Sequence, residues 1–119
     1  MRERERADQK AALRARFRAV RASIPHRGAV DEAICARLDA EIASARTLVL
    51  FWPLAGEVDV RPLLGALLRR GASVALPVVV PGDAPRLVAR VFTDEADLVA
   101  GPFGLREPPP DARLVAAPD

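Results

Sequence analysis

The sequence has few of the residues that characterise extracellular, metal-binding or membrane-spanning proteins. Among its 119 residues there is one cysteine and one histidine, and there is no tyrosine. The single Cys35 excludes an internal disulfide and a metal site built from several cysteines. The first ten residues, MRERERADQK, lack the apolar stretch of a secretory signal, and no apolar run is long enough to cross a membrane. We therefore expect a cytoplasmic protein with a single domain over residues 1–119.

Lysine is almost absent as well, because 17 of the 18 basic residues are arginine and only Lys10 is lysine. In such a background a lone lysine indicates a position that favours a compact ammonium group. The charge is also uneven: residues 1–27 carry nine basic and three acidic side chains (net +6), and the remainder carries nine and thirteen (net −4). This asymmetry fits either an anionic partner near the N-terminus or a solvated helix surface.

The spacing of apolar residues predicts two N-terminal helices, over residues 6–24 and about 30–44. In the first helix an apolar stripe repeats every three or four residues: Leu13, Phe17, Val20 and Ile24. A basic stripe at the same spacing lies beside it: Lys10, Arg14, Arg18 and Arg21. In the second helix the residues expected to face inward are Val30, Ile34, Leu38 and Ile42.

A strand–helix–strand pattern follows, with strands at Thr47–Trp52 and Ser73–Val80. Two strands joined by a crossover helix are expected to be parallel, and because neither alternates we expect both faces to be buried. Pro77 argues for an edge or a bulge in the second strand. The pattern predicts an α/β fold, with a three-layer αβα arrangement, a mainly parallel sheet and an N-terminal helical pair.

Shorter signals complete this prediction. Asp59 is placed to cap the crossover helix, over about residues 60–70, and Gly71 is placed to end it. After the turn PGDAPR, residues Leu87–Phe92 alternate as a half-exposed strand does, and Thr93 is placed to cap a short helical turn.

Glu57, within LVLFWPLAGEVDV, lies just past the end of the first expected strand. Ligands of open parallel sheets bind outside the carboxyl ends of the strands. A carboxylate there is suited to accept two N–H donors from a flat heterocycle such as a pterin ring, with Phe51 and Trp52 as a wall. The competing interpretation is that Trp52 belongs to the core and Glu57 to a surface loop.

Four segments, in order, resemble 5-formyltetrahydrofolate cyclo-ligase, also called methenyltetrahydrofolate synthetase. The segments are KAALR (10–14), LVLFWPLAGEVDV (48–60), RPLLGALLRRGASVALPVV (61–79) and GPFGLREP (101–108). The first of these motifs is common by itself, and the specificity comes from the four in register. The resemblance extends from about residue 8 to residue 119.

The resemblance implies an ATP- and magnesium-dependent ligase of one-carbon folate metabolism. Its ligands would be 5-formyltetrahydrofolate and ATP, with no nucleic acid or membrane, and the full-length protein is expected to be a monomer. Lys10 and Arg14 match residues that contact ATP phosphates. Trp52, Glu57 and Phe103 match residues of the folate site. No position is assigned as a catalytic residue or as a metal ligand.

The sequence also departs from the family pattern. Leu87 is the apolar residue nearest to the position of a methionine that lies beside the pterin in the family. The family continues with a glycine-rich nucleotide loop, a tyrosine pair and the aspartates that hold magnesium, none of which is present here. We therefore expect a fragment of a longer gene product or a chain that needs a partner, with an exposed apolar face and an open sheet edge.

Two other functions stay open. One is an inactive fragment or interaction subunit, and the other is a nucleic-acid-binding module that uses the arginines of the first helix. Against the second, aromatic residues make up only 4% of the chain, so no stacking platform is evident. His26 is expected at the surface, and the acidic residues at 94, 95 and 97 are expected on the exposed face of a turn, not in a metal site.

Overall fold

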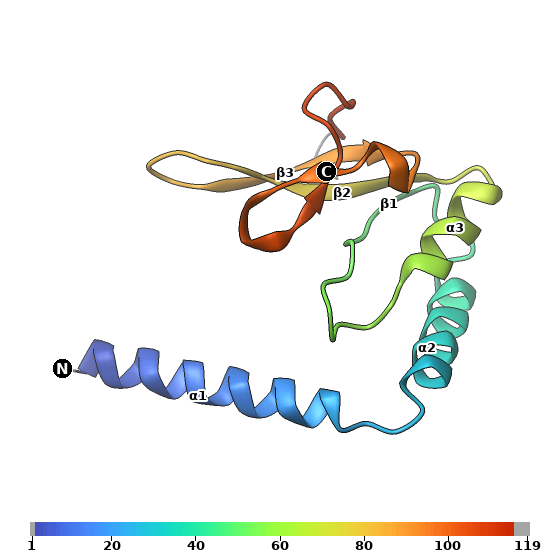
Figure 1. Cartoon of the computed structure of the whole chain (residues 1–119). Helices are drawn as coiled ribbons and strands as arrows, with labels where there is room; N and C mark the ends of the chain where they lie inside the picture. The colour runs from blue at the N-terminus through green and yellow to red at the C-terminus, as the bar shows by residue number, and fades with distance from the viewer. Residues whose placement is uncertain (1, 116–119) are drawn as a thin grey trace.

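Three α-helices, a three-stranded sheet and a two-stranded sheet make up residues 2–115, which are the residues that this computed structural model describes (Figure 1). The elements are, in chain order, α1 (Arg2–Ala22), α2 (Arg27–Glu41), β1 (Thr47–Val49), α3 (Arg61–Arg69), β2 (Ser73–Val80), β3 (Arg86–Phe92), η1 (Glu95–Asp97), β4 (Val99–Ala100), η2 (Pro102–Gly104) and β5 (Arg106–Glu107). The predicted α/β class and the N-terminal helical pair are therefore confirmed.

The larger sheet is mixed and not mainly parallel. β1 pairs with β2 in parallel, as the strand–helix–strand pattern predicts, but β2 pairs with β3 antiparallel over seven residue pairs. The cause is the turn after β2, because a short turn can join antiparallel strands whereas parallel strands need a long crossover. Residues 113–115 continue the sheet beyond β3, where Val115 N donates to Ala89 O and Val91 N donates to Arg113 O, each at 2.8 Å.

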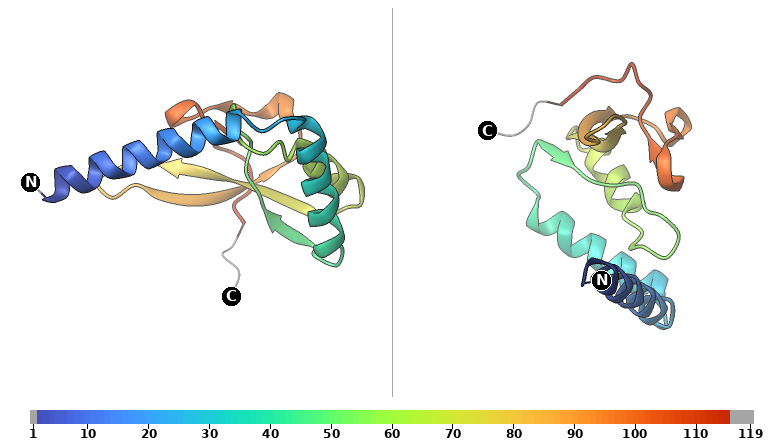
Figure 2. Two further views of the ribbon diagram at one scale, coloured as in Figure 1. Left: turned by 90° about the horizontal axis from the view of Figure 1, so that it is seen from below. Right: turned by 90° about the vertical axis from the view of Figure 1, so that its left-hand side faces the viewer.

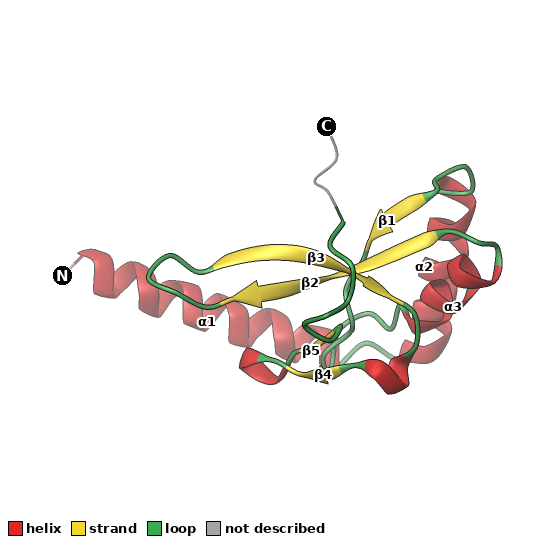
Figure 3. Ribbon diagram, turned by 90° about the horizontal axis from the view of Figure 1, so that it is seen from above, coloured by secondary structure: helices red, strands yellow, loops and turns green. Residues whose placement is uncertain are grey.

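The hydrophobic core lies between α3 and the sheet. Leu63, Leu64 and Leu67 on one face of α3 are buried against Val74 and other residues of β2 and β3. Burying a leucine side chain fully is worth about 1.5–3 kcal/mol, so this helix contributes much of the core stability. All three helices lie on the same side of the sheet (Figure 3), and residues 2–115 therefore form no third layer of helices.

Because the opposite face has no helix in the described residues, β1 is not buried on both faces as expected. Leu48, Leu50 and Trp52 pack against the core. Val49 and Phe51, which alternate with them, are 51% and 39% exposed. The segment from Thr47 to Trp52 thus behaves as a half-buried ribbon, although its sequence does not alternate between apolar and polar residues.

The C-terminal end of α3 agrees with the sequence, whereas at the other end the N-cap residue is Val60 and not Asp59, which was expected there. Asp59 Oδ1 accepts a hydrogen bond from the backbone N–H of Arg61 at 3.0 Å, at the start of the helix. At the other end Gly71 takes a positive φ of 85°, and Ala72 N donates to Leu67 O at 3.0 Å. Glycine adopts this left-handed conformation without steric cost, which is why it ends the helix.

The buried face of α2 agrees with the prediction only in part: Ile42 packs against the core as expected. Val30 and Leu38 are exposed, whereas Asp31 and Cys35 are the buried residues of the helix. Polar contacts explain this rotation, because both buried side chains bond to the backbone of Asp59, which precedes α3. Burial raises the pKa of the Cys35 thiol, which keeps it in the neutral form that a buried apolar position requires.

α1 lies apart from the sheet, as Figure 1 and the right view of Figure 2 show. The helix has no buried residue, and its apolar stripe is exposed. The radius of gyration is 16.6 Å, compared with about 13.5 Å for a compact domain of this length. Within residues 2–115 no helix combines the length and apolar character needed to cross a membrane.

Half of β2 forms an edge of the sheet. β1 ends opposite Ala75, whose carbonyl oxygen accepts a hydrogen bond from Leu50 N. Backbone groups of alternate residues point the same way, so those of Pro77 and Val79 point to the side where β1 no longer pairs with β2. Val79 N donates to the buried carboxylate of Glu107 at 2.8 Å. Pro77 has no N–H to satisfy, and its predicted edge position is confirmed for this part of the strand.

Candidate functional site

The chain leaves the sheet after β1 and forms a loop that carries Glu57. Within this loop Glu57 Oε1 accepts a hydrogen bond from Leu54 N at 2.7 Å, and Glu57 N donates to Leu54 O at 3.1 Å. Gly56 takes a positive φ of 87°, which allows the chain to turn tightly between them. The half-buried carboxylate therefore closes its own turn, and its second oxygen remains available to a donor from a ligand.

A depression of about 290 Å³ lies beside this carboxylate. The residues that line it belong to the loop and the start of α3: Pro53, Leu54, Ala55, Gly56, Glu57, Asp59 and Arg61. It combines an apolar wall with two carboxylates and one guanidinium group. Such a surface suits a flat ligand that has both apolar and hydrogen-bonding edges.

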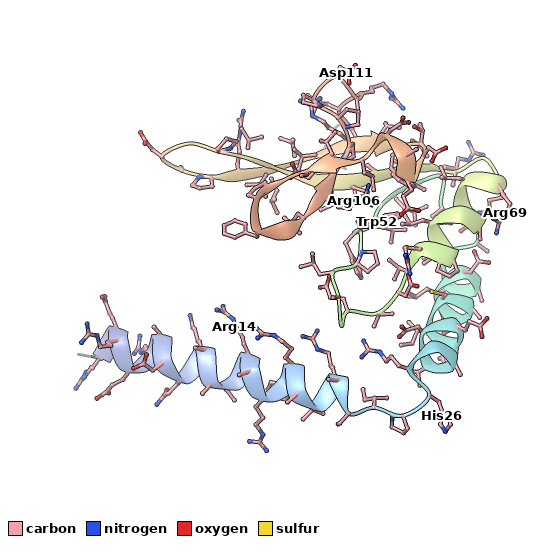
Figure 4. All side chains as sticks on the ribbon, viewed as in Figure 1. Arg14, His26, Trp52, Arg69, Arg106 and Asp111 are labelled. Atoms are coloured by element: carbon pink, nitrogen blue, oxygen red, sulfur yellow. The ribbon has the colours of Figure 1, made fainter. Side chains whose placement is uncertain are left out.

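Trp52 fits both interpretations offered by the sequence. Its ring packs against the core, with its centroid 5.8 Å from that of Phe92. It also lines a second depression, of about 230 Å³, in which Arg61 takes part. The guanidinium of Arg106 lies 5.9 Å from the centroid of the Trp52 ring, and Figure 4 shows the two side chains together below the sheet.

Arg61 lies between these two depressions and lines both of them. Its guanidinium binds Asp59 with two parallel hydrogen bonds, Nε to Oδ1 at 2.8 Å and Nη2 to Oδ2 at 2.9 Å. The hydrogen bonds from Arg61 lower the pKa of Asp59. Trp52 and Glu57 thus border two depressions that share Arg61, whose charge is paired with Asp59.

The other predicted site residues lie elsewhere in the structure. Lys10 and Arg14 are exposed on α1, and Arg14 lines an open surface depression formed by residues 13–21 of that helix. Phe103 is 87% exposed at the turn between β4 and β5, with a φ of 62°. Figure 4 shows Arg14 on α1, apart from Trp52 and Arg106. The roles of Lys10, Arg14 and Phe103 remain predictions.

Sequence reasoning missed Arg106 and Arg61 as neighbours of the candidate site. Arg106 stands three residues after Phe103 in the GPFGLREP segment, so the motif itself was the available signal. Arg61 follows Asp59 by two residues, and only the start of α3 brings its guanidinium back over the loop. Acidic side chains at η1 are exposed, as expected for a turn, but the residue that caps it is Asp94, which accepts a hydrogen bond from Ala96 N, and not Thr93 as predicted.

A parallel β1–α3–β2 unit with an acid and a tryptophan after β1 defines an α/β protein whose candidate ligand site lies at the strand ends. No protein-family model matches the chain. Curated proteins named 5-formyltetrahydrofolate cyclo-ligase, from Escherichia coli K12 and O157:H7, are each 34% identical to it over 74 residues. Those residues are 62% of this chain and 41% of the relatives' length.

The solved structures include a related protein, the 5,10-methenyltetrahydrofolate synthetase of Aquifex aeolicus. It matches with a TM-score of 0.72 and 26% identity, over 89% of this chain and 54% of that one. These findings confirm the resemblance: over the part that it spans, the chain is similar in sequence and fold to proteins named 5-formyltetrahydrofolate cyclo-ligase or 5,10-methenyltetrahydrofolate synthetase. The chain covers less than half of its curated relatives and about half of the solved one.

Proposed function

We propose that this chain supplies the folate site and part of the nucleotide site of a cytoplasmic, ATP-dependent 5-formyltetrahydrofolate cyclo-ligase. The observation that carries the proposal is Glu57, a half-buried carboxylate in the loop after β1 that borders a depression of about 290 Å³. Its position in a fold similar to that of a methenyltetrahydrofolate synthetase supports a folate ligand.

On the folate side, Glu57 would accept N–H donors from the pterin ring. One oxygen is oriented by Leu54 N, so the carboxylate does not have to be ordered when the ligand binds. Trp52 offers a ring face, and Arg106 beside it adds a positive charge. This combination of a flat wall and a free carboxylate oxygen suits a planar, donor-bearing heterocycle.

On the nucleotide side, Lys10 and Arg14 lie one helical turn apart on α1 and would neutralise phosphate charge. In the proposed reaction the formyl oxygen attacks the γ-phosphorus of ATP and ADP leaves. N10 then attacks the formyl carbon, and release of phosphate gives 5,10-methenyltetrahydrofolate. The magnesium of the family does not fit residues 2–115, which hold no group of three or more His, Cys, Asp or Glu residues suited to a metal ion.

Ligand binding to two variants tests this assignment. Glu57→Gln should weaken binding of 5-formyltetrahydrofolate about 10- to 100-fold, because a charged acceptor is lost, and should leave ATP binding within about twofold. Lys10→Ala should weaken ATP binding and leave binding of 5-formyltetrahydrofolate within about twofold. Quenching of Trp52, the only tryptophan, would report the folate, and calorimetry would report ATP.

Glu41→Gln, at an exposed position of α2, is the matched control and should change neither affinity. Equal losses of both ligands in each variant would indicate a folding defect instead of two separate contacts. A folded chain that binds neither ligand would overturn the proposal and favour an interaction subunit.

A further inference from the structure

Arg27, at the start of α2, joins three separate segments of the chain. Its guanidinium donates from Nη1 to Arg21 O at 3.0 Å, from Nε to Asp31 Oδ1 at 3.2 Å, and from Nη2 to Gly56 O at 2.7 Å. The side chain is 24% exposed, so the group is partly removed from water. A planar guanidinium can serve three acceptors in fixed directions, which an ammonium group on a flexible stem does not reproduce.

Asp31 extends this connection to the other side of the loop. Its residue is 8% exposed, and while Oδ1 accepts from Arg27, Oδ2 accepts from the backbone N–H of Asp59 at 3.2 Å. The ion pair therefore holds the chain at Gly56, one residue before Glu57, and at Asp59, two residues after it. These two points bracket the carboxylate proposed to bind the folate.

The hydrogen bonds within the loop do not hold it against the rest of the molecule. The pair of hydrogen bonds between Leu54 and Glu57 fixes the shape of the turn but not its position in the molecule. Within residues 2–115, the side-chain hydrogen bond that joins residues 54–57 to another element comes from Arg27. The shape of the loop is therefore set by Leu54 and Glu57, and its position in the molecule by Arg27.

We propose that Arg27, together with Asp31, is a positioning residue that holds the Glu57 loop in its place for the ligand. The inference rests on the proposed function for the identity of that ligand, 5-formyltetrahydrofolate. Arg27 does not line the depression beside Glu57, so its effect on binding would pass through the loop and not through contact with the ligand.

Hydrogen–deuterium exchange of the chain without ligand tests the positioning directly. In Arg27→Ala, amides of residues 54–59 should exchange about tenfold faster, while amides of the buried β2 core keep their wild-type rates. The matched control is Arg70→Ala. Like Arg27, Arg70 binds a carboxylate and a backbone carbonyl, Asp39 at 3.0 Å and Ile42 O at 2.8 Å, but it does so at the far end of α2 and has no second carbonyl partner. It should leave exchange in residues 54–59 unchanged.

Binding provides the second readout. The dissociation constant for 5-formyltetrahydrofolate should rise about tenfold in Arg27→Ala, with that for ATP changing much less. Arg27→Lys keeps the positive charge beside Asp31 but cannot make all three hydrogen bonds. Its exchange rates and its dissociation constant for 5-formyltetrahydrofolate should lie between those of the wild type and Arg27→Ala. If Arg27→Ala does not fold, the lysine variant is compared with the wild type instead.

The two proposals fail in different ways. Unchanged exchange at residues 54–59 in the Arg27 variants overturns the positioning role, whatever the ligand does. Faster exchange with unaltered folate affinity, in a chain that binds folate, also overturns it. A wild-type chain that binds no folate refutes the proposed function, and the exchange result then decides on its own whether Arg27 holds the loop.

Discussion

Asp59 links more segments than any sequence pattern around it indicates. Its carboxylate accepts hydrogen bonds from the backbone and side chain of Arg61, its N–H donates to Asp31, and its carbonyl accepts from Cys35 Sγ. It was expected to serve as a helix cap, and it does accept from the first residue of α3. Its pKa is lowered first by the side-chain hydrogen bond with Arg61, so its charged form stabilises the fold.

This lowered pKa predicts an acid-dependent stability. The contribution of the Asp59–Arg61 pair is fully present above the ordinary value of 3.8 and is lost as the pH falls through the lower, folded-state value. Because the Asp59 side chain is 34% exposed, solvent limits the effect to about 0.5–1 kcal/mol. Asp59→Asn should be less stable than wild type by that amount at pH 7, and the difference should shrink below pH 3.8, as urea unfolding would measure.

Asp83→Asn, in the exposed turn between β2 and β3, serves as the control and should behave like the wild type at every pH. A stability difference for Asp59→Asn that stays constant down to acid pH would show that the pair does not depend on the ionised carboxylate.

At the scale of elements, β4 and β5 depend on a close contact between Gly101 and Glu107. A Cβ atom added at Gly101 would lie 2.5 Å from the carboxyl carbon of Glu107, closer than real side chains allow. That carboxylate is held by Val79 N and cannot move away freely. We therefore predict that Gly101→Ala destabilises the protein by about 1–3 kcal/mol in a chemical denaturation experiment.

Gly28, near the start of α2, provides the comparison. An added Cβ there meets no atom within 4 Å, and alanine favours a helix, so Gly28→Ala should stabilise the protein by up to about 1 kcal/mol. Similar effects for the two substitutions would mean that the Gly101 contact is unimportant.

The elements themselves were largely predictable from the sequence, because helical periodicity and helix-ending residues are local signals. The three helices begin and end within a few residues of the expected positions. The rotation of α2 was not predictable, since it depends on Asp31 and Cys35 meeting the backbone of Asp59, about 25 residues away. The place of Glu57 could be inferred because it lies in the loop that connects β1 to α3. The bond from Arg27 to Gly56 spans 29 residues and leaves no pattern in the sequence.

At the scale of the whole molecule, the clearest feature is the separation of α1 from the rest. A helix of 21 residues without buried side chains has little tertiary support, and isolated helices of this length are only marginally stable in water. Limited trypsin digestion should therefore cut first within α1, whose eight basic residues are all exposed: Arg2, Arg4, Arg6, Lys10, Arg14, Arg16, Arg18 and Arg21.

Mass spectrometry of the digest would identify the order of cleavage. The expected early product retains α2, α3 and the sheet, and Arg70, which is bonded to Asp39 and Ile42 O, should be cut later. Cleavage after Arg70 before any cut within α1 would contradict the view that α1 is the least supported element.

The uncovered half of β2 has a consequence for how copies of this chain meet one another. A strand edge recruits a further strand through outward-pointing N–H groups, and such recruitment is how many proteins polymerise. Here Pro77 has no such group and that of Val79 is occupied by Glu107. The two outward donor positions next to β1 are therefore unavailable to a strand from another copy, so this part of the edge does not favour edge-to-edge pairing.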